Sequence, residues 1–353
     1  MSDISKIDKN FNIETTIERE GLTFHKITED VFTVCGLIRE GGAWVRMPDA
    51  IAKEVSEGVH SLSKHTAGGR VRFITDSPYI VVKAETPGAY LMSHMPETGL
   101  AGFDLYASVD GRDESYVKTF IPPVPPKNEF DGVIDIAFEG ERVYTINFPL
   151  YCAVKDLYIG LKAGSVLKKA PEYDISSPFV YYGSSITQGG CASRPGNSYQ
   201  AMITRRYNAD HINLGFSGNG KGEPVMAEYI AGLDMSLFVM DYDHNAPTPE
   251  HLRATHKPLY DAVRKTHPDI PIIMLSRPKP NLSAEEKQRV EIIKETYESA
   301  IAAGDNNVYF ITGAELSELC GNDGTVDGCH PNDLGFYSMY VRLSREIDKI
   351  LKK

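Results

Sequence analysis

Apolar and polar residues follow two different patterns along the chain, and the pattern changes near residue 175. Between residues 25 and 165, short runs rich in Val, Ile, Tyr and Thr are separated by Gly, Pro and Asp, and several alternate apolar and polar positions, as in "GRVRFITD". This period of two predicts half-buried strands, and many short strands favour an antiparallel β-sandwich or jelly roll. One helix is expected over residues 48–62, where four apolar residues share a face: Ile51, Val55, Val59 and Leu62.

After residue 175, continuous apolar runs alternate with amphipathic ones. Strands are expected at "SPFVYYG", "HINLGFSG", "SLFVMDYD", "IPIIMLSRP" and "NVYFITG". Helices are expected between and after them: one kinked at Pro258, one opened by the capping box Ser283-x-x-Glu286, and a last one over 334–351. About five parallel strands with crossover helices indicate a doubly wound α/β domain. We therefore predict an all-β domain over residues 1–172 and an α/β domain over residues 176–353, with the linker inside 168–178.

Composition narrows the functional classes. The net charge of −11 argues against a nucleic-acid binder, which would present a basic face. The polar start "MSDISKIDKNFNIE" lacks a signal-peptide core, and no run is long enough to span a bilayer. Five cysteines suit a reducing compartment. We therefore expect a cytoplasmic protein with no nucleic-acid or membrane partner. A secreted protein trimmed of its signal peptide would have the same sequence features. The chain could act as a monomer or as a homo-oligomer.

Small and polar residues gather where the predicted parallel strands end. Ser184 and Ser185 follow the first strand, "GFSGNG" and "DYDHN" lie at the ends of the second and third strands, and "DGCHPND" lies just before the final helix. A serine hydroxyl needs a base to become a nucleophile, and His330 is the candidate. Asp327, three residues earlier, could bind the far nitrogen of its ring. These residues predict a nucleophile, base and orienting acid at one edge of the sheet.

A tetrahedral intermediate also needs hydrogen-bond donors for its oxyanion. The backbone N–H groups of Ser185 and Gly218 and the side-chain amide of Asn245 are the candidates. Each candidate also has a purely structural interpretation. The serine could cap a helix or lie in a turn, the Asp–His pair could be a surface pair, and Asn245 could start an Asx turn. The four stretches in chain order favour catalysis. Thr187 occupies the place of the second glycine of a Gly-x-Ser-x-Gly elbow, which disfavours the α/β-hydrolase fold.

These motifs resemble those of the SGNH hydrolase superfamily, the GDSL-type esterases and lipases. The family's Gly-Asp-Ser-Ile-Thr block is similar to "GSSIT" at 183–187, which implies Ser185 as nucleophile, Gly218 and Asn245 as oxyanion donors, and Asp327 and His330 as the rest of a triad. The resemblance implies a three-layer, flavodoxin-like α/β fold. The first half resembles the jelly-roll-like domain that carries a Gly-x-Asp-Leu-Tyr signature, here "GFDLY" at 102–106. The chain departs from the family where Ser184 replaces an aspartate and where Asp-Tyr-Asp-His-Asn stands in the third block.

Other polar residues have weaker signals. Arg194 and His244 are candidate substrate-binding residues, and a structural salt bridge is the alternative for Arg194. Cys191 and Cys329 flank the catalytic stretches, but their spacing fits no common zinc pattern, so we expect neither metal nor cofactor. Trp44 could stack on a sugar or belong to the sandwich core.

The resemblance implies a serine esterase. The N-terminal domain that precedes the catalytic domain resembles the jelly-roll-like domain of carbohydrate esterases. We expect short-chain, acetyl-type esters, with O-deacetylation of a carbohydrate and an acyl-enzyme on Ser185. A lysophospholipase or thioesterase is the alternative, and a non-catalytic glycan-binding module is a further one. The short linker also predicts that the N-terminal domain packs against the catalytic domain and forms one wall of the substrate cleft; a spacer or oligomerisation platform is the alternative.

Overall fold

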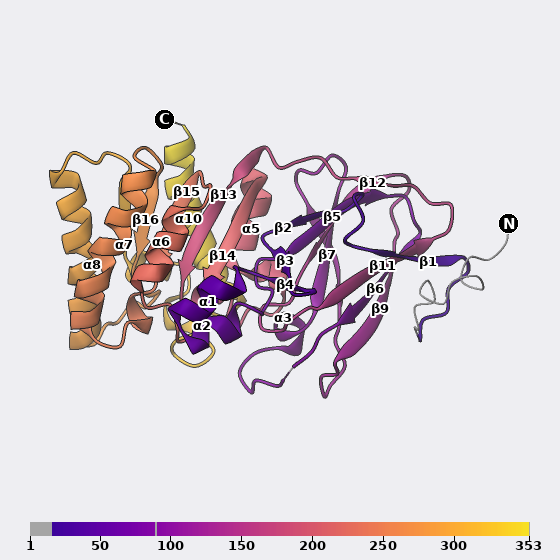
Figure 1. Ribbon diagram of the computed structural model, residues 1–353, viewed down its shortest axis with the longest axis horizontal. Helices are drawn as coiled ribbons and strands as arrows, with labels where there is room; N and C mark the ends of the chain where they lie inside the picture. The colour runs from indigo at the N-terminus through magenta and orange to yellow at the C-terminus, as the bar shows by residue number, and fades with distance from the viewer. Residues whose placement is uncertain (1–15, 89, 353) are drawn as a thin grey trace.

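The computed structural model describes residues 16–88 and 90–352, so the polar start of the chain lies outside the described residues. Figure 1 shows a β-rich half followed by an α/β half. The first half has two antiparallel sheets, ordered β1-β11-β6-β9 and β12-β5-β10-β7-β8, with β2 also paired to β5. Their bounds are β1 Leu22–Lys26, β2 Thr33–Cys35, β5 Arg70–Thr75, β6 Tyr79–Glu85, β7 Phe103–Ser108, β8 Ser115–Phe120, β9 Glu129–Asp135, β10 Arg142–Asn147, β11 Asp156–Lys162 and β12 Leu167–Lys169. The sandwich predicted from the alternating pattern is confirmed.

A compact apolar core joins the two sheets. It is built from the inward-facing residues of the strands, such as Phe73, Ile80, Leu105 and Ile146. Trp44, on the small hairpin β3 (Ile38–Glu40) and β4 (Ala43–Val45), belongs to this core and is 7% exposed. Its interpretation as a core residue, rather than a sugar platform, is therefore confirmed.

The second half is a five-stranded parallel sheet in the order β14-β13-β15-β16-β17, the flavodoxin-like order. The strands are β13 Ile175–Gly183, β14 Ala209–Gly215, β15 Leu237–Asp241, β16 Ile272–Leu275 and β17 Val308–Ile311. The helices are α4 Ser185–Gln188, α5 Tyr199–Tyr207, α6 Pro224–Ala231, α7 Pro249–Thr266, α8 Ala284–Ala302, α9 Gly313–Leu316 and α10 Asp333–Leu351. The predicted doubly wound fold is confirmed.

Helices cover both faces of this sheet because successive strand residues point to opposite sides. Val180 and Tyr182 of β13 pack in one core with α6, α7 and α8, whereas Phe179 and Tyr181 pack in the other with α5 and α10. Helix α8 begins with the predicted capping box of Ser283 and Glu286. Helix α7 runs from Pro249 to Thr266 without a break at Pro258.

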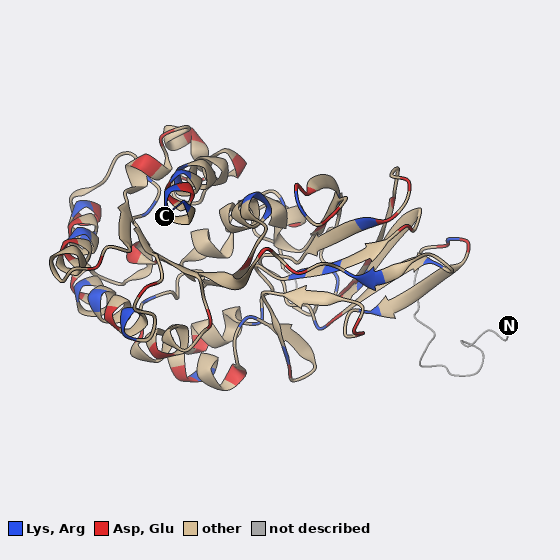
Figure 2. Cartoon of the chain, turned by 90° about the horizontal axis from the view of Figure 1, so that it is seen from above, with Lys and Arg blue, Asp and Glu red and all other residues tan. Residues whose placement is uncertain are grey.

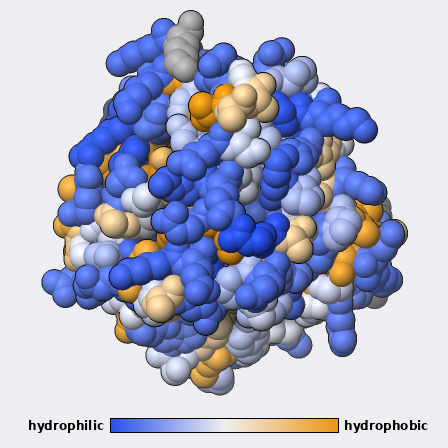
Figure 3. All heavy atoms as spheres, turned by 90° about the vertical axis from the view of Figure 1, so that its left-hand side faces the viewer, coloured by the Kyte–Doolittle hydropathy of each residue, from blue (hydrophilic) through white to orange (hydrophobic). Residues whose placement is uncertain are grey.

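Charged residues lie along the helices, while the parallel strands carry few (Figure 2). The end of the molecule formed by the outer helices is mostly hydrophilic, with small separate apolar spots (Figure 3). None of the helices in the described part of the chain has the length and apolar character needed to cross a bilayer.

The two halves share their hydrophobic cores. The helix expected at 48–62 is two helices, α1 (Asp49–Val55) and α2 (Glu57–Leu62), because Ser56 is extended and its side chain caps α2 by accepting from the Val59 N–H at 3.1 Å. Its apolar face packs against β13, β14 and α6 of the α/β half. On the other side of the sheet, Leu100 of α3 (Glu97–Leu100) and Tyr151 join the core that contains Ile186. The predicted packing between the halves is therefore observed.

Candidate active site

The candidate site lies where the order of the parallel strands reverses, a preferred ligand position in such sheets. Gly183, at the end of β13, pairs in register with Gly215 of β14 on one side and Asp241 of β15 on the other. The loops after these three strands therefore begin side by side. They carry the predicted stretches "SSIT", "FSGNG" and "YDHN".

The structure brings together the predicted nucleophile, base and acid. The Ser185 Oγ lies 2.9 Å from the His330 Nε2, and the His330 Nδ1 lies 2.7 Å from the Asp327 Oδ2. Ser185 is 6% exposed, and the His330 and Asp327 side chains are 23% and 35% exposed. This is the geometry in which a histidine can take a proton from a serine while a carboxylate fixes its tautomer.

The loop around Asp327 keeps its carboxylate ionised. Burial alone would raise the pKa of Asp327, but hydrogen bonds from the His330 ring and from the N–H groups of His330 and Cys329 outweigh burial and lower the pKa to about 2. The carboxylate can therefore hold a proton on the His330 Nδ1 across the neutral range, which leaves the Nε2 free to accept one.

Small residues surround Ser185 because the backbone is crowded there. A Cβ on Gly183 would lie 2.0 Å from the Thr187 Oγ1 and 2.2 Å from the Asp241 carbonyl oxygen, closer than any real contact. Ser184 accepts from the Ile186 N–H at 3.1 Å and caps helix α4. Ser184, which replaces the family's aspartate, therefore caps a helix, whereas Ser185 faces His330.

The oxyanion candidates lie on neighbouring loops. Ser185 is the first residue of helix α4, where a backbone N–H has no acceptor within the helix. Gly218 has a φ of 68°, which favours glycine, and nothing lies within 4 Å of where its Cβ would be. The Asn245 amide donates one N–H to the Phe216 carbonyl at 3.1 Å, so it is held beside the Gly218 loop with a second N–H to offer.

The two predicted substrate-binding residues have partners of their own. Arg194 contacts the sandwich, with its Nη1 2.9 Å from the Asp104 Oδ2 and its guanidinium 3.9 Å from the centre of the Tyr116 ring. The His244 Nδ1 lies 3.0 Å from the Asp243 Oδ1. The His244 Nε2 is buried and has no hydrogen-bond partner among the described residues.

Within the described part of the N-terminal half, Tyr151 and His94 lie beside the triad, and the sequence analysis missed both. The Tyr151 hydroxyl donates to the Ser185 carbonyl at 3.2 Å, and the His94 ring lies 5.5 Å from the His330 ring, centre to centre. A Cβ on Gly190 would come within 2.9 Å of the same Tyr151 hydroxyl. Neither residue belongs to a spacing motif, so only the packing of the two halves reveals them.

Among the described residues, two sets of side chains have donor atoms close enough for a metal ion. His94, Cys191 and His330 form one set, and Asp327, Cys329 and His330 form the other; within each set, one donor atom per residue lies within 4.8 Å of the others. Both sets include the candidate base.

Comparisons with known proteins identify the family of the chain. Residues 176–348 match the GDSL-like lipase/acylhydrolase family, and residues 22–167 match the N-terminal domain of SGNH-hydrolase-type esterases. A protein from Bacteroides ovatus ATCC 8483, assigned as a GDSL-like lipase, has 32% sequence identity and a TM-score of 0.84, over 94% of this chain and 98% of that one. The chain belongs to the GDSL-like lipase/acylhydrolase family.

Other structures share the fold of this GDSL-like hydrolase at lower identity. A salicylyl-acyltransferase from a tetracycline biosynthetic pathway has 22% identity and a TM-score of 0.75, over 94% of this chain and 98% of that one. An acetyl xylan esterase from the rumen bacterium Butyrivibrio proteoclasticus has 13% identity and a TM-score of 0.60, over 94% and 99%. Among curated proteins, none matches the chain. The resemblance to SGNH esterases with a Gly-x-Asp-Leu-Tyr domain is confirmed, and ester hydrolysis is the activity that the family and fold support.

Proposed function

We propose that this protein is a serine esterase that removes acetyl and other short acyl groups from a carbohydrate. The observation that carries the proposal is the continuous hydrogen-bonded series from the Ser185 Oγ through the His330 ring to the Asp327 carboxylate, with separations of 2.9 and 2.7 Å.

The reaction proceeds in two steps. The Ser185 Oγ attacks the ester carbonyl while the His330 Nε2 takes its proton, and His330 then passes this proton to the leaving alcohol. Water, whose proton the same nitrogen takes, then attacks the acyl-enzyme; the bond to the Ser185 Oγ breaks, the Oγ takes the proton back from His330, and the acid leaves. Asp327 stays ionised throughout and stabilises the protonated imidazole.

Donors on three loops stabilise the oxyanion in both steps. The carbonyl oxygen of the substrate accepts hydrogen bonds as it becomes negatively charged. Its donors are the Ser185 and Gly218 N–H groups and the second N–H of the Asn245 amide. Because Phe216 already holds the Asn245 amide, little reorganisation is needed when negative charge develops.

The space around Ser185 supports a small acyl group. Gly190 packs against Tyr151, and the neighbouring Cys191 is 3% exposed, so the loop after the nucleophile offers little room on that side. The N-terminal half supplies His94 and Tyr151, and we propose that it forms one wall of the alcohol-binding side. Structures that share both halves include an acetyl xylan esterase, which supports a carbohydrate as the alcohol.

A series of p-nitrophenyl esters from acetyl to dodecanoyl tests the acyl group, followed by acetylated oligosaccharides with detection of free acetate. We expect acetyl esters to have the highest kcat/KM and acetate to be released from an oligosaccharide. Faster cleavage of octanoyl or longer esters would instead favour the lysophospholipase or thioesterase alternative. Acyl transfer to an added alcohol, without release of acid, would indicate an acyltransferase.

A further inference from the structure

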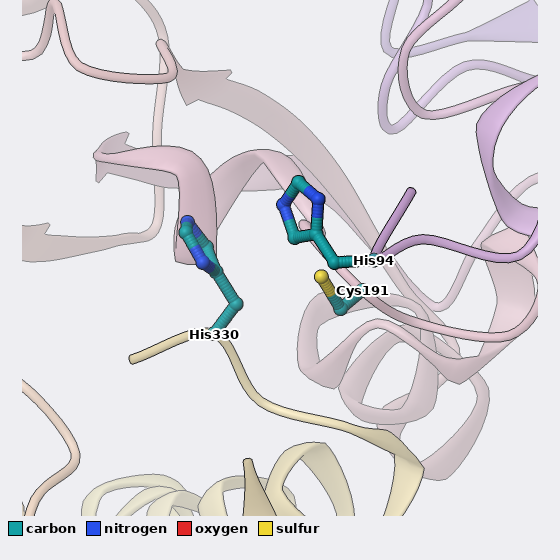
Figure 4. Close-up of side chains that lie close together, drawn as sticks. All are labelled: His94, Cys191 and His330. Carbon is teal, nitrogen blue, oxygen red and sulfur yellow. The ribbon is translucent and has the colours of Figure 1, made fainter. Parts of the chain in front are cut away.

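We propose that His94, Cys191 and His330 form an inhibitory binding site for a zinc-type divalent cation. The three residues come from distant parts of the chain: a loop of the N-terminal half, the loop after the nucleophile, and the loop before α10. Figure 4 shows their side chains reaching into the same region. One donor atom from each lies within 4.8 Å of the others. The inference rests on the proposed role of His330 only for its effect on catalysis, not for the binding of the ion.

The donor set suits zinc rather than a hard cation. Two imidazole nitrogens and one thiolate are ligands that Zn²⁺ prefers, whereas Mg²⁺ and Ca²⁺ prefer oxygen. Ligands of a tetrahedral zinc ion lie about 3.3–3.8 Å from one another. Since the donor atoms already lie within 4.8 Å of one another, shifts of up to about 1–1.5 Å bring them to these separations, and the exposed His94 ring can turn toward the other two donors. The fourth position is left to water.

The surroundings of His330 also resemble a zinc ligand's. Its Nδ1 lies 2.7 Å from the Asp327 carboxylate, and a carboxylate on the far nitrogen is the usual support of a zinc-binding histidine. Because Asp327 holds the ring proton on the Nδ1, the Nε2 carries the lone pair. This nitrogen can accept from the Ser185 hydroxyl or bind a metal ion, but not both at once. Zn²⁺ binding releases the thiol proton of Cys191 to solvent and occupies the Nε2. His330 then cannot take the proton of Ser185, and ester cleavage stops.

The second set, Asp327, Cys329 and His330, is a poorer site. The His330 nitrogen nearest to Asp327 is the Nδ1, which is already hydrogen-bonded to the Asp327 carboxylate. The same carboxylate also accepts hydrogen bonds from the backbone N–H groups of Cys329 and His330. A metal ion there would have to replace these bonds. The first set needs only the Ser185 hydroxyl to be displaced. Its wide spacing along the chain explains why no zinc motif appears in the sequence.

The test measures binding and inhibition separately on the full chain. Co²⁺ binding gives a thiolate charge-transfer absorption, and Zn²⁺ is then titrated against p-nitrophenyl acetate hydrolysis, with each variant normalised to its own metal-free rate. Cys191→Ala and His94→Ala each remove one ligand. Cys320→Ala removes a partly buried thiol that belongs to neither set and serves as the control, and Cys329→Ala tests the second set.

We expect the Co²⁺–thiolate band in the wild type and in Cys320→Ala but not in Cys191→Ala. Even a supporting residue behind a ligand contributes about 10- to 100-fold to metal affinity, so loss of a ligand should raise the half-inhibiting Zn²⁺ concentration at least about tenfold in Cys191→Ala and His94→Ala. EDTA should restore activity. The inference is overturned if no band appears, or if Cys329→Ala relieves inhibition and Cys191→Ala does not; neither result affects the proposed hydrolysis. Binding at Cys191 without loss of activity would overturn the inhibitory role and contradict His330 as the base.

Discussion

The carboxylate of Asp104 lies 2.9 Å from the guanidinium Nη1 of Arg194, and it joins the sandwich to the loop that follows the nucleophile. Asp104 is fully buried and also accepts from the Gly196 N–H and the Asn147 amide, each at 2.8 Å. Asp104 is the aspartate of the Gly-x-Asp-Leu-Tyr signature, and Tyr106 of the same signature contacts Arg194. Residues of the Gly-x-Asp-Leu-Tyr signature therefore bind the N-terminal domain to the catalytic domain.

Replacing Asp104 should destabilise the whole chain. Asp104→Ala leaves the Arg194 guanidinium, only 20% exposed, and two N–H donors without their acceptor. Breaking such a buried pair costs about 3–5 kcal/mol of unfolding free energy. Urea denaturation should measure this loss, with Asp30→Ala as an exposed carboxylate control. A loss equal to that of the control would contradict the interface role of the signature.

The two adjacent serines should behave differently when each is replaced by alanine. Ser185→Ala removes the nucleophile and should lower kcat by at least about a thousandfold. Ser184→Ala removes a helix cap, which costs about 1 kcal/mol of stability, and should keep most of the activity. Steady-state kinetics and mass spectrometry of the acyl-enzyme check both. An acyl group on Ser184, or full activity in Ser185→Ala, would contradict the assignment.

Asn245→Ala tests the oxyanion assignment. Removing one oxyanion donor lowers kcat by roughly 100- to 1000-fold in serine hydrolases, because the interaction forms mainly in the transition state. We expect a loss of this size with a much smaller change in KM. The amide also holds the Phe216 carbonyl, so a thermal melt must accompany the kinetics. A change in KM alone would indicate that Asn245 binds substrate rather than the oxyanion.

The sequence predicted the α/β half well because each of its elements is locally encoded. Continuous apolar strands, the Ser283 cap and the amphipathic last helix all carry their signals within about ten residues. The position of Ser185 could be predicted because it directly follows a parallel strand, whereas His330 and Asp327 were predicted from their Asp-x-x-His spacing before the last helix. The contributions of His94 and Tyr151 could not be predicted, because they depend on how two separately encoded domains pack. The break at Ser56 was missed because the apolar face continues across it, while a single side-chain cap decides the backbone.

Buried Asp241 should make stability depend on pH. Burial raises its pKa to about 7, and only one of its oxygens, the Oδ2, has hydrogen-bond partners among the described residues: Thr187 at 2.9 Å and Tyr199 at 3.3 Å. In the unfolded chain the carboxyl ionises near 3.8. Between pH 3.8 and 7 the folded state binds more protons, so the free energy of unfolding falls as the pH rises and levels off above about 7.

Asp241→Asn removes this titration, so its stability should fall less than that of the wild type between pH 4 and pH 8. Urea denaturation at both pH values measures the difference. Parallel behaviour of the two proteins would mean that Asp241 is ionised in the folded state at acidic pH.

The two halves should fold as one unit. Val59, on α2 of the N-terminal half, is fully buried in the same core as Val180 and Leu214 of the parallel sheet. Val59→Ala removes two methyl groups, which should lower the unfolding free energy by about 2 kcal/mol and shift a single cooperative transition rather than create a second one.

A chain that begins near Asp174 tests the same interface more severely. It would expose the two apolar cores that the halves share, one on each face of the parallel sheet, and we expect it to be insoluble or unfolded. If that chain folds and releases acetate from an oligosaccharide at the full rate, the N-terminal half neither completes the core nor forms a wall of the substrate cleft. If it folds, cleaves p-nitrophenyl acetate and loses the oligosaccharide, the shared core is dispensable but the wall is real.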